Sequence, residues 1–297
     1  MAVYLGLDCG GSSCRALAVD EQNHVVHTGQ SGPANILSTP RVRLRQNLRR
    51  ATEGCPPVSV VCGCFAGLIT NADRTLAQGI LSDLFPDARI RCEPDYAAAL
   101  LACPEGTDVC VVSGTGSVLC SEHEGVLAKS GGRGYLLGNA GSAFYYGREA
   151  IRHFLETGPD EASEAMRNEV ERRVGSLAEN EVVATVHRTS SPAALLARFA
   201  NPLGRDAMAG LPYAIEAVER GSRLLASQTA THVLRYAPSA NPVRIALAGG
   251  LWSGPAIFRG IFESAVCEAL APRTVIVSRI TMPPVQGAVR LAMETNP

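Results

Sequence analysis

The feature that most constrains this chain is a set of three apolar runs that each end in small, glycine-rich residues. The runs are "LGLDCGGSSC" at 5–14, "VVSGTGSVL" at 111–119 and "IALAGGLWSG" at 245–254. Glycine lets the backbone approach a ligand closely, and successive exposed N–H groups can bind phosphate oxygens. Any one of these runs is compatible with a simple tight turn. The three together indicate loops that bind a phosphorylated small molecule.

Strand-like and helix-like segments alternate along the first third of the chain, which predicts an α/β sheet covered by helices. The predicted strands are 3–8, 14–20, 24–29, 58–64 and 89–93, and the predicted helices are 39–53, 72–84 and 95–103. The first three strands follow one another with short turns and are expected to be antiparallel. The arginines of 39–53 are interpreted as the solvated face of an amphipathic helix.

The second part of the chain begins with two strands on either side of the turn at 114–116. From 142 to 237 the pattern is helical, with breaks expected at Gly158–Pro159, Ser191–Pro192 and Asn201–Pro202. A strand ending at Gly249–Gly250, a helix at 254–270, a strand at 274–278 and a last helix after Pro284 complete the prediction. The second part is therefore a further α/β unit with a large helical insertion.

Composition favours a chain that binds a small molecule in an aqueous compartment. Of its 297 residues, 46% are hydrophobic and 19% charged, with a net charge of −1, so neither nucleic acid nor an anionic membrane is expected as a partner. No run of about 18 apolar residues and no basic leader is seen, which predicts a cytoplasmic protein.

Ten cysteines and six histidines raise the question of a metal site. Most of the cysteines lie inside apolar, strand-like runs, which favours buried thiols over ligands. Cys62 and Cys64 form a C-x-C pair with no second pair at zinc spacing, and the histidines are scattered. Trp252, the single tryptophan, is interpreted as a packing residue. The sequence therefore predicts no metal held by cysteine or histidine.

The acid in the first turn is the most informative charged residue. The chain contains no G-x-x-x-x-G-K-[ST] motif, and "GGRGYLLG" lacks the strand and acid of a dinucleotide site. A strand–turn–strand segment that carries Asp8, Gly10, Gly11, Ser12 and Ser13 is a different way to bind a nucleotide. Its carboxylate can hold hydrated Mg²⁺, while hydroxyl and N–H groups bind the phosphates of ATP.

The order and spacing of these loops resemble those of the ATPases related to actin and hexokinase, and more narrowly the N-acetylglucosamine kinases and the BadF/BadG-type ATPase family. The similarity extends over "GPANIL", "EPDYAAALLA", "SGTGS", "GGRGYLLGNAGSAFYYG", "ALAGG" and "PPVQGAVRLA", which together cover nearly the whole chain. The resemblance implies two ribonuclease H-like domains around an ATP-binding cleft. The expected domains are 1–112 and 113–297, with a helical insertion at 142–237 and the last helix returning to the first domain.

The resemblance also implies roles for particular residues. The ATP-binding residues would be Gly10, Gly11, Ser12, Ser13, Gly114, Thr115, Gly116, Ser117, Gly249 and Gly250, with Asp8 on the Mg²⁺ side. Asp95 would accept the proton of the substrate hydroxyl, a role compatible with the ordinary one of an acid at a helix start. Asn35, Asp95, Gly132 and Asn139 would bind a sugar, although Asn35 could equally be a turn-capping residue.

One loop departs from the family pattern. Where relatives read Gly-Asp-Glu-Gly-Ser, this chain has Gly138-Asn139-Ala140-Gly141-Ser142, and Arg133 stands where many relatives have an aromatic residue. Asn139 can donate and accept hydrogen bonds but cannot act as an anionic acceptor. An altered sugar preference is therefore expected.

The expected activity is transfer of the γ-phosphate of ATP to a hydroxyl, the 6-OH, of an amino sugar such as N-acetylglucosamine, by a chain that could form a homodimer. Two alternatives remain open. The chain could be an ATPase that drives a partner enzyme, like the activators of 2-hydroxyacyl-CoA dehydratases and benzoyl-CoA reductases. It could also be a sugar or nucleotide sensor with altered catalysis, as the Asn139–Ala140 replacement suggests.

Overall fold

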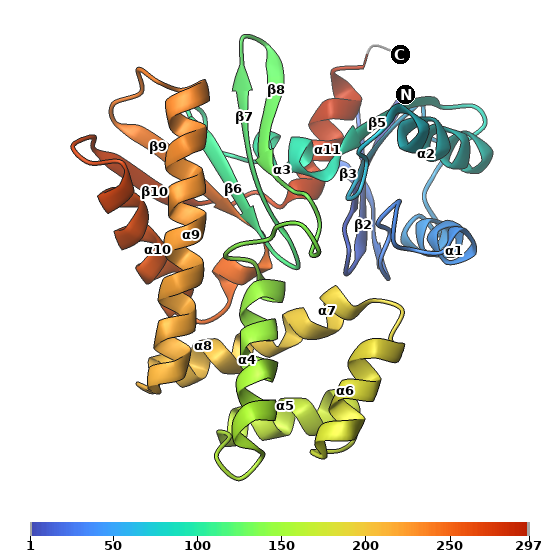
Figure 1. The fold of residues 1–297 in the computed structure, drawn as a ribbon. Helices are drawn as coiled ribbons and strands as arrows, with labels where there is room; N and C mark the ends of the chain where they lie inside the picture. Colours follow the sequence, from blue (N-terminus) through green and yellow to red (C-terminus); the bar gives the residue numbers. More distant parts are fainter. Residues whose placement is uncertain (1, 296–297) are drawn as a thin grey trace. The chain divides into compact units, whose positions relative to one another are not determined.

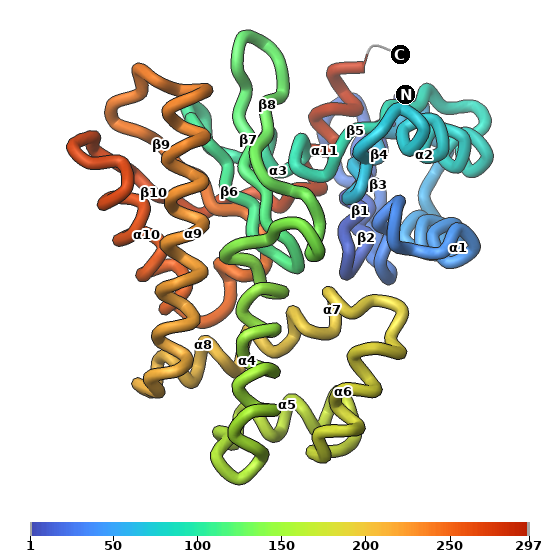
Figure 2. The backbone as a smooth tube through the Cα atoms, in the orientation of Figure 1, coloured from blue at the N-terminus to red at the C-terminus, as the bar shows by residue number. Residues whose placement is uncertain are grey.

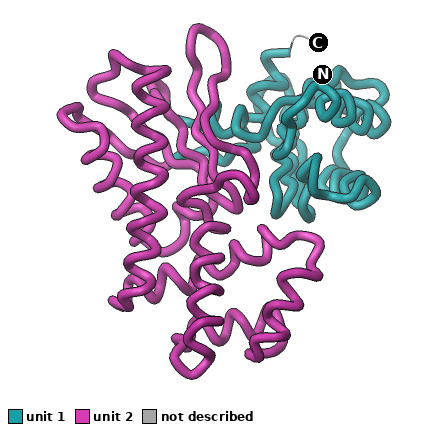
Figure 3. Tube along the Cα trace, viewed as in Figure 1, with its two compact units in different colours: residues 1–104, 280–297 teal, residues 105–279 magenta. Residues whose placement is uncertain are grey.

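The computed structural model describes residues 2–295 and divides the chain into two compact units (Figure 3). Unit 1 comprises the chain up to residue 104 and resumes at residue 280, and unit 2 spans residues 105–279. The boundary differs from the expected one at 112/113. The strand at 109–113 pairs with strands of the second sheet and not with the first, so it belongs to unit 2.

Unit 1 is built on a five-stranded sheet of order β3-β2-β1-β4-β5 (Figures 1 and 2). Its elements are β1 (Val3–Cys9), β2 (Cys14–Asp20), β3 (Val25–Ser31), α1 (Arg41–Ala51), β4 (Val60–Phe65), α2 (Asn71–Leu84), β5 (Arg89–Pro94), α3 (Asp95–Leu101) and α11 (Pro284–Met293). β1, β2 and β3 are antiparallel neighbours, whereas β4 and β5 run parallel to β1. The predicted ranges agree with these elements to within a residue or two at their ends.

Side chains that alternate along β1 point to the two faces of the unit 1 sheet, and these faces differ. Leu5, Leu7 and Cys9 are fully buried in the cluster that also contains the apolar faces of α1 and α2. On the opposite face, α11 lies so close to β1 that a Cβ on Gly6 would come within 2.4 Å of the backbone nitrogen of Val289. The C-terminal helix is therefore an integral layer of unit 1.

Unit 2 contains a second five-stranded sheet, of order β10-β9-β6-β7-β8. Its elements are β6 (Val109–Ser113), β7 (Ser117–His123), β8 (Val126–Gly131), α4 (Ala143–Thr157), α5 (Glu164–Val174), α6 (Glu179–Arg188), α7 (Pro192–Leu196), the 3₁₀ turn η1 (Ala197–Phe199), α8 (Ala200–Met208), α9 (Pro212–Tyr236), β9 (Val243–Ala248), the 3₁₀ turn η2 (Gly250–Ser253), α10 (Ala256–Ala269) and β10 (Val275–Arg279).

The two sheets have the same topology. In each, a central strand pairs antiparallel with the next strand and parallel with a strand that follows a helical connection; β6, β7, β8, β9 and β10 thus repeat β1, β2, β3, β4 and β5. A repeated mixed sheet covered by helices confirms the expected α/β class.

Two features of unit 2 differ from the sequence expectation. The sequence analysis did not predict β8, although the turn between β7 and β8 has a sequence typical of a hairpin. Glu124 and Gly125 have φ values of 51° and 74°, as a two-residue type I′ hairpin requires. The break expected at Asn201–Pro202 is instead inside α8. Pro202 occupies the first turn of that helix, where backbone N–H groups have no intrahelical partner and a proline is tolerated.

The cysteines behave as predicted: seven of the ten are buried, and these lie within the two sheets. Trp252 is buried too, and its ring nitrogen donates to the Val111 carbonyl oxygen (3.2 Å). Among residues 2–295, no helix combines the length and the apolar character needed to cross a bilayer.

A buried histidine joins α9 to the β7–β8 hairpin. His232 is 1% exposed, and its ring nitrogens lie 3.0 Å from the Ser121 hydroxyl and 2.7 Å from the Ser130 hydroxyl. Burial, with a smaller contribution from Arg235, lowers the pKa of His232 from 6.5 to about 4. The folded protein therefore keeps this ring neutral under conditions in which the unfolded chain protonates it.

This histidine predicts an acid-dependent loss of stability. The folded pKa of His232 is lower than the unfolded one, so its contribution is complete above pH 6.5 and is lost as the pH falls toward about 4. We expect the free energy of unfolding to fall by about 2 kcal/mol across this range relative to His232→Gln. Urea unfolding of both proteins at several pH values measures the difference, and parallel curves would contradict the assignment.

Candidate active site

The carboxyl ends of three parallel strands meet at one edge of the unit 1 sheet. Cys9 of β1 is in register with Phe65 of β4, which is in register with Pro94 of β5. The residues that follow these strand ends are the Gly10 turn, Ala66 and Asp95, which starts α3. In α/β sheets, this edge is where ligands bind. The topology thus brings Gly10 and Asp95 to the same edge, although 85 residues separate them.

The segment containing Asn35 is hydrogen-bonded across this edge. The backbone N–H of Ala34 donates to the Gly10 carbonyl oxygen, and that of Ile36 donates to the Ala66 carbonyl oxygen, each at 3.0 Å. The side-chain oxygen of Asn35 accepts from the backbone N–H groups of Leu37 (2.9 Å) and Ser38 (3.0 Å). The turn-capping role is therefore real, and it leaves the amide nitrogen as the donor that a ligand could use.

Asp8 lies on the α11 face of β1, between Arg15 of β2 and Cys64 of β4 in the strand register. Burial raises the pKa of Asp8 from 3.8 to about 6, an effect that the positive charge of Arg15 opposes. Asp8 is half-buried and forms no ion pair with any residue from 2 to 295, and such a carboxylate is suited to a bound cation. A single carboxylate matches Mg²⁺, which keeps several waters and otherwise binds substrate phosphates.

In unit 2, the turn between β6 and β7 lies against the N-terminus of α4. The backbone N–H groups of Ala143 and Phe144 donate to the carbonyl oxygens of Gly114 (2.8 Å) and Thr115 (3.4 Å). The buried hydroxyl of Ser113 donates to the Gly141 carbonyl oxygen (2.8 Å). These contacts fix the Gly114–Gly116 turn against the start of α4 and use the first N–H groups of that helix.

Asn139 helps to form this turn. It has a left-handed backbone (φ 75°), which asparagine tolerates well, and it is buried. Its side-chain oxygen accepts from the Ser117 backbone N–H (3.4 Å), and its carbonyl oxygen accepts from the Ser142 hydroxyl (2.8 Å). The side chain therefore faces the Gly114–Ser117 turn of its own unit, a contact that the sequence pattern did not indicate.

The β9 end adjoins the same turn. Gly249 has φ 102°, and a Cβ there would lie 2.2 Å from the Ser113 carbonyl oxygen, so the fold itself requires glycine. A Cβ on Gly114 would lie 3.9 Å from the backbone nitrogen of Gly250. The Gly114 and Gly249–Gly250 loops thus form one continuous backbone surface in unit 2.

The loop from Gly132 to Ser142 extends from β8. Gly132 (φ 65°) donates its N–H to the Ser117 carbonyl oxygen at 3.1 Å. Leu136 and Leu137 are 80% and 77% exposed, and Arg133 is also exposed. The loop therefore carries an apolar pair and a cation, with no acid between residues 132 and 142.

Gly11 and Gly250 have no role that the fold explains. A Cβ at either position would meet nothing within 4 Å, and neither has a positive φ. Glycine lowers the stability of a fold where any residue is allowed, because it gains more entropy on unfolding. Open space above both residues is what close approach of a ligand to the backbone requires. Gly79 and Gly260 have the same open space but lie within helices, whereas Gly11 and Gly250 follow the carboxyl ends of β1 and β9, the edge at which α/β sheets bind ligands.

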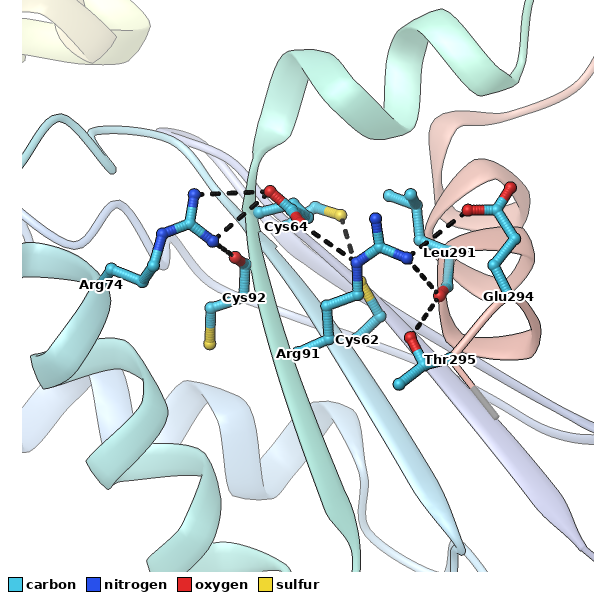
Figure 4. A network of polar contacts seen from close by, with 9 residues as sticks. Cys62, Cys64, Arg74, Arg91, Cys92, Leu291, Glu294 and Thr295 are labelled. Carbon is cyan, nitrogen blue, oxygen red and sulfur yellow. Dashed lines mark hydrogen bonds and ion pairs between the residues drawn. The ribbon is translucent and has the colours of Figure 1, made fainter. Parts of the chain in front are cut away.

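A polar network that the sequence pattern did not reveal supports β5, the strand that leads to Asp95 (Figure 4). The Glu93 carboxylate accepts from Arg91 (3.1 Å) and lies 3.4 Å from Arg74 of α2. Arg91 also donates to the Leu291 carbonyl oxygen at the end of α11 (3.0 Å). The charged residues that alternate with apolar ones in "RIRCEP" were the sequence feature from which this network could have been predicted. The network joins β5 to helices on both sides and restrains the start of α3.

The matching family model covers residues 5–292, and its description is the BadF/BadG/BcrA/BcrD ATPase family. The chain belongs to this family. Among curated proteins, the N-acetylmuramic acid/N-acetylglucosamine kinase of Clostridium acetobutylicum is 26% identical over 167 residues, which are 53% of this chain and 55% of that protein. The chain therefore matches about half the length of such relatives.

Solved structures show that this family member shares its fold with sugar kinases. A candidate N-acetylglucosamine kinase of Porphyromonas gingivalis superposes with a TM-score of 0.76 at 18% identity, covering 99% of both chains. A glucokinase of the ROK family from Streptomyces griseus, solved with glucose and AMPPNP, gives 0.65 at 16% identity, covering 99% of this chain and 100% of that one. At these identities, the likeness establishes the two-domain α/β fold.

Alanine at Gly11 or Gly250 should weaken ATP binding without lowering the stability of the fold. We expect Gly11→Ala and Gly250→Ala to keep or slightly raise the thermal midpoint, because alanine reduces unfolded-state entropy. We expect the same variants to weaken ATP binding by on the order of tenfold, because the new methyl group occupies the approach to the backbone. Calorimetric titration with ATP and thermal unfolding measure both effects.

Gly260→Ala in α10 is the matched control, since a Cβ there also meets nothing within 4 Å. It should raise stability by about 1 kcal/mol and leave ATP binding unchanged. Equal ATP affinity in all three variants would contradict the assignment of the loops.

Asp8→Asn should stabilise the metal-free protein. The raised pKa of Asp8 means that ionisation costs the folded state stability, progressively from pH 3.8 to about 6 and fully above that. We expect the variant to exceed wild type by about 2 kcal/mol at neutral pH and to equal it below pH 3.8. Denaturant unfolding in chelator tests the prediction, and a less stable variant at neutral pH would refute it.

Proposed function

We propose that this chain is an ATP-dependent sugar kinase that transfers the γ-phosphate of ATP to a hydroxyl of an amino sugar. The observation that carries the proposal is the arrangement in unit 1. There, a carboxylate, an asparagine segment and a glycine turn from distant parts of the chain lie at the carboxyl ends of adjacent parallel strands. Membership of an ATPase family supports ATP as the nucleotide.

Asp95 is the proposed general base. It accepts the proton of the substrate hydroxyl as that oxygen bonds to the γ-phosphorus and the bond to the leaving ADP oxygen breaks. Asn35 binds another hydroxyl of the sugar through its amide. Gly132 and Asn139 remain predicted sugar-binding residues, and the observed contact of Asn139 with Ser117 gives it the additional role of shaping a turn.

Each unit contributes its own nucleotide-binding residues to this proposal. In unit 1 they are Gly10, Gly11, Ser12 and Ser13, and in unit 2 they are Gly114, Thr115, Gly116, Ser117, Gly249 and Gly250. Mg²⁺ would neutralise the phosphate charge, and Asp8 would hold it through water. N-acetylglucosamine is the proposed substrate, and it is one of the two sugars in the name of the curated kinase relative. The proposed acceptor is its 6-OH.

Replacing the base should abolish transfer without abolishing nucleotide binding. We expect Asp95→Asn to lower kcat by about 10²–10⁴-fold, because the proton acceptor is lost, while the dissociation constant for ATP stays unchanged. Asp83→Asn, which alters an exposed acid of α2 that pairs with Arg45, is the matched control and should retain full activity. Turnover by Asp95→Asn at the wild-type rate would rule out the base assignment.

A panel of sugars separates the kinase from its alternatives. ADP release is measured with N-acetylglucosamine, glucosamine, glucose and no sugar, in the presence of ATP and Mg²⁺. Release that depends on an amino sugar supports the kinase. Release at the same rate without sugar would indicate an ATPase that drives a partner, and ATP binding without any turnover would indicate a sensor.

A further inference from the structure

The helix that begins at Asp95 is too short to fix its own direction. α3 has 7 residues, and isolated helices of fewer than about 12 residues are marginal in water. It follows Pro94, whose side chain cannot accept a hydrogen bond from the first turn. Its buried side chains are the alanines at 97–99, which bury little apolar surface. Contacts from other elements must therefore determine where Asp95 lies.

The C-terminal helix α11 holds the middle and the end of α3. A Cβ on Gly287 would lie 2.0 Å from the Ala98 carbonyl oxygen, so the two helix backbones are in direct contact. Arg290 donates to the carbonyl oxygen of Leu101, the last residue of α3, at 2.9 Å. The start of α3 follows directly from β5, so the position of Asp95 depends on how the end of β5 is held.

Glu93 lies between two arginines at the end of β5. Its side chain is 22% exposed, and its carboxylate accepts from Arg91 at 3.1 Å and lies 3.4 Å from Arg74. Arg74 also donates to the Cys92 carbonyl oxygen, so α2 contacts both the backbone and a side chain of this strand end. Because the carboxylate is largely shielded from water, these pairs are stronger than pairs on an open surface.

Arg91 connects this carboxylate to α11 (Figure 4). Its guanidinium donates to the Leu291 carbonyl oxygen at 3.0 Å and lies 3.4 Å from the Glu294 carboxylate. A planar guanidinium with five N–H donors can make all of these contacts at once, which an ammonium group cannot. The same helix that holds α3 is therefore tied to the strand that leads into it.

We propose that Glu93 and Arg91 are positioning residues for Asp95 and that α11 is the element to which they fix it. The inference rests on the proposed function, in which Asp95 is the base. Pro94 is the single residue between Glu93 and Asp95, and its ring restricts φ, so it cannot absorb a shift by rotating. A displacement at Glu93 therefore moves the base relative to the hydroxyl that it must deprotonate.

Steady-state kinetics of Glu93→Gln, with ATP, Mg²⁺ and the amino sugar that wild type uses, tests the proposal. We expect kcat to fall about tenfold, because the base is misplaced, while KM for ATP and for the sugar changes by less than about twofold. Glu93→Asp keeps the charge and should retain more of kcat than Glu93→Gln. A residue that only stabilises the fold would lower the thermal midpoint and leave kcat of the folded protein unchanged.

Arg91→Lys is the second variant, because it keeps the positive charge but loses the planar fork that joins Glu93 to α11. It should lower kcat in the same way as Glu93→Gln. Glu263→Gln in α10 is the matched control, since it removes a carboxylate that is 31% exposed and paired with Arg259 in the other unit. It should keep the wild-type kcat. Thermal unfolding checks that each variant is folded at the assay temperature.

Amide hydrogen exchange of the peptide 95–101 provides a readout that needs no turnover. We expect it to exchange about tenfold faster in Glu93→Gln than in wild type, with no change in α10. Unchanged exchange, or a wild-type kcat in both Glu93→Gln and Arg91→Lys, would overturn the proposal. Absence of sugar phosphorylation by wild type would instead refute the kinase function, so the two failures are distinguishable.

Discussion

In-register parallel pairing of β1, β4 and β5 is the interaction on which the candidate site depends. Cys9, Phe65 and Pro94 share one row of the sheet, and each is followed by a segment that the site needs. A strand that slipped by one residue would reverse its two faces, and Asp8 would then point into the apolar core in place of Leu7. The helices on both faces prevent such a slip, because each packs on side chains that alternate along the strands.

Two classes of glycine in this chain have different physical origins. Gly6, Gly249 and Gly287 are imposed by the protein, since a Cβ at each would lie 2.0–2.4 Å from backbone atoms of another segment. Gly11 and Gly250 meet nothing at all. Glycines of the first class fix where segments lie against each other, and those of the second keep backbone N–H groups accessible. Sequence alone cannot separate Gly249 from Gly250, because both follow the same apolar strand, β9.

The local sequence pattern was enough to predict most of the strands and helices. Apolar runs and helical amphipathicity predicted the elements of unit 1 closely, and the glycine turns predicted the candidate loops. Features set by long-range packing were less accessible. The exact boundary between the units, which depends on where β6 pairs, could not be obtained from local signals. Nor could the inward orientation of Asn139, which depends on the position of Ser117. The Arg74–Glu93–Arg91 network likewise appears only when α2, β5 and α11 are assembled.

The repeated sheet topology has an evolutionary consequence. In unit 1, the connection from the third to the fourth strand contains α1 alone, whereas the equivalent connection in unit 2 holds all the helices from α4 to α9. A duplicated ancestral module could therefore gain length at this connection without changing a single strand pairing. α9, which leads directly into β9, corresponds to α1, so the helices from α4 to α8 are the part of unit 2 that has no counterpart in unit 1.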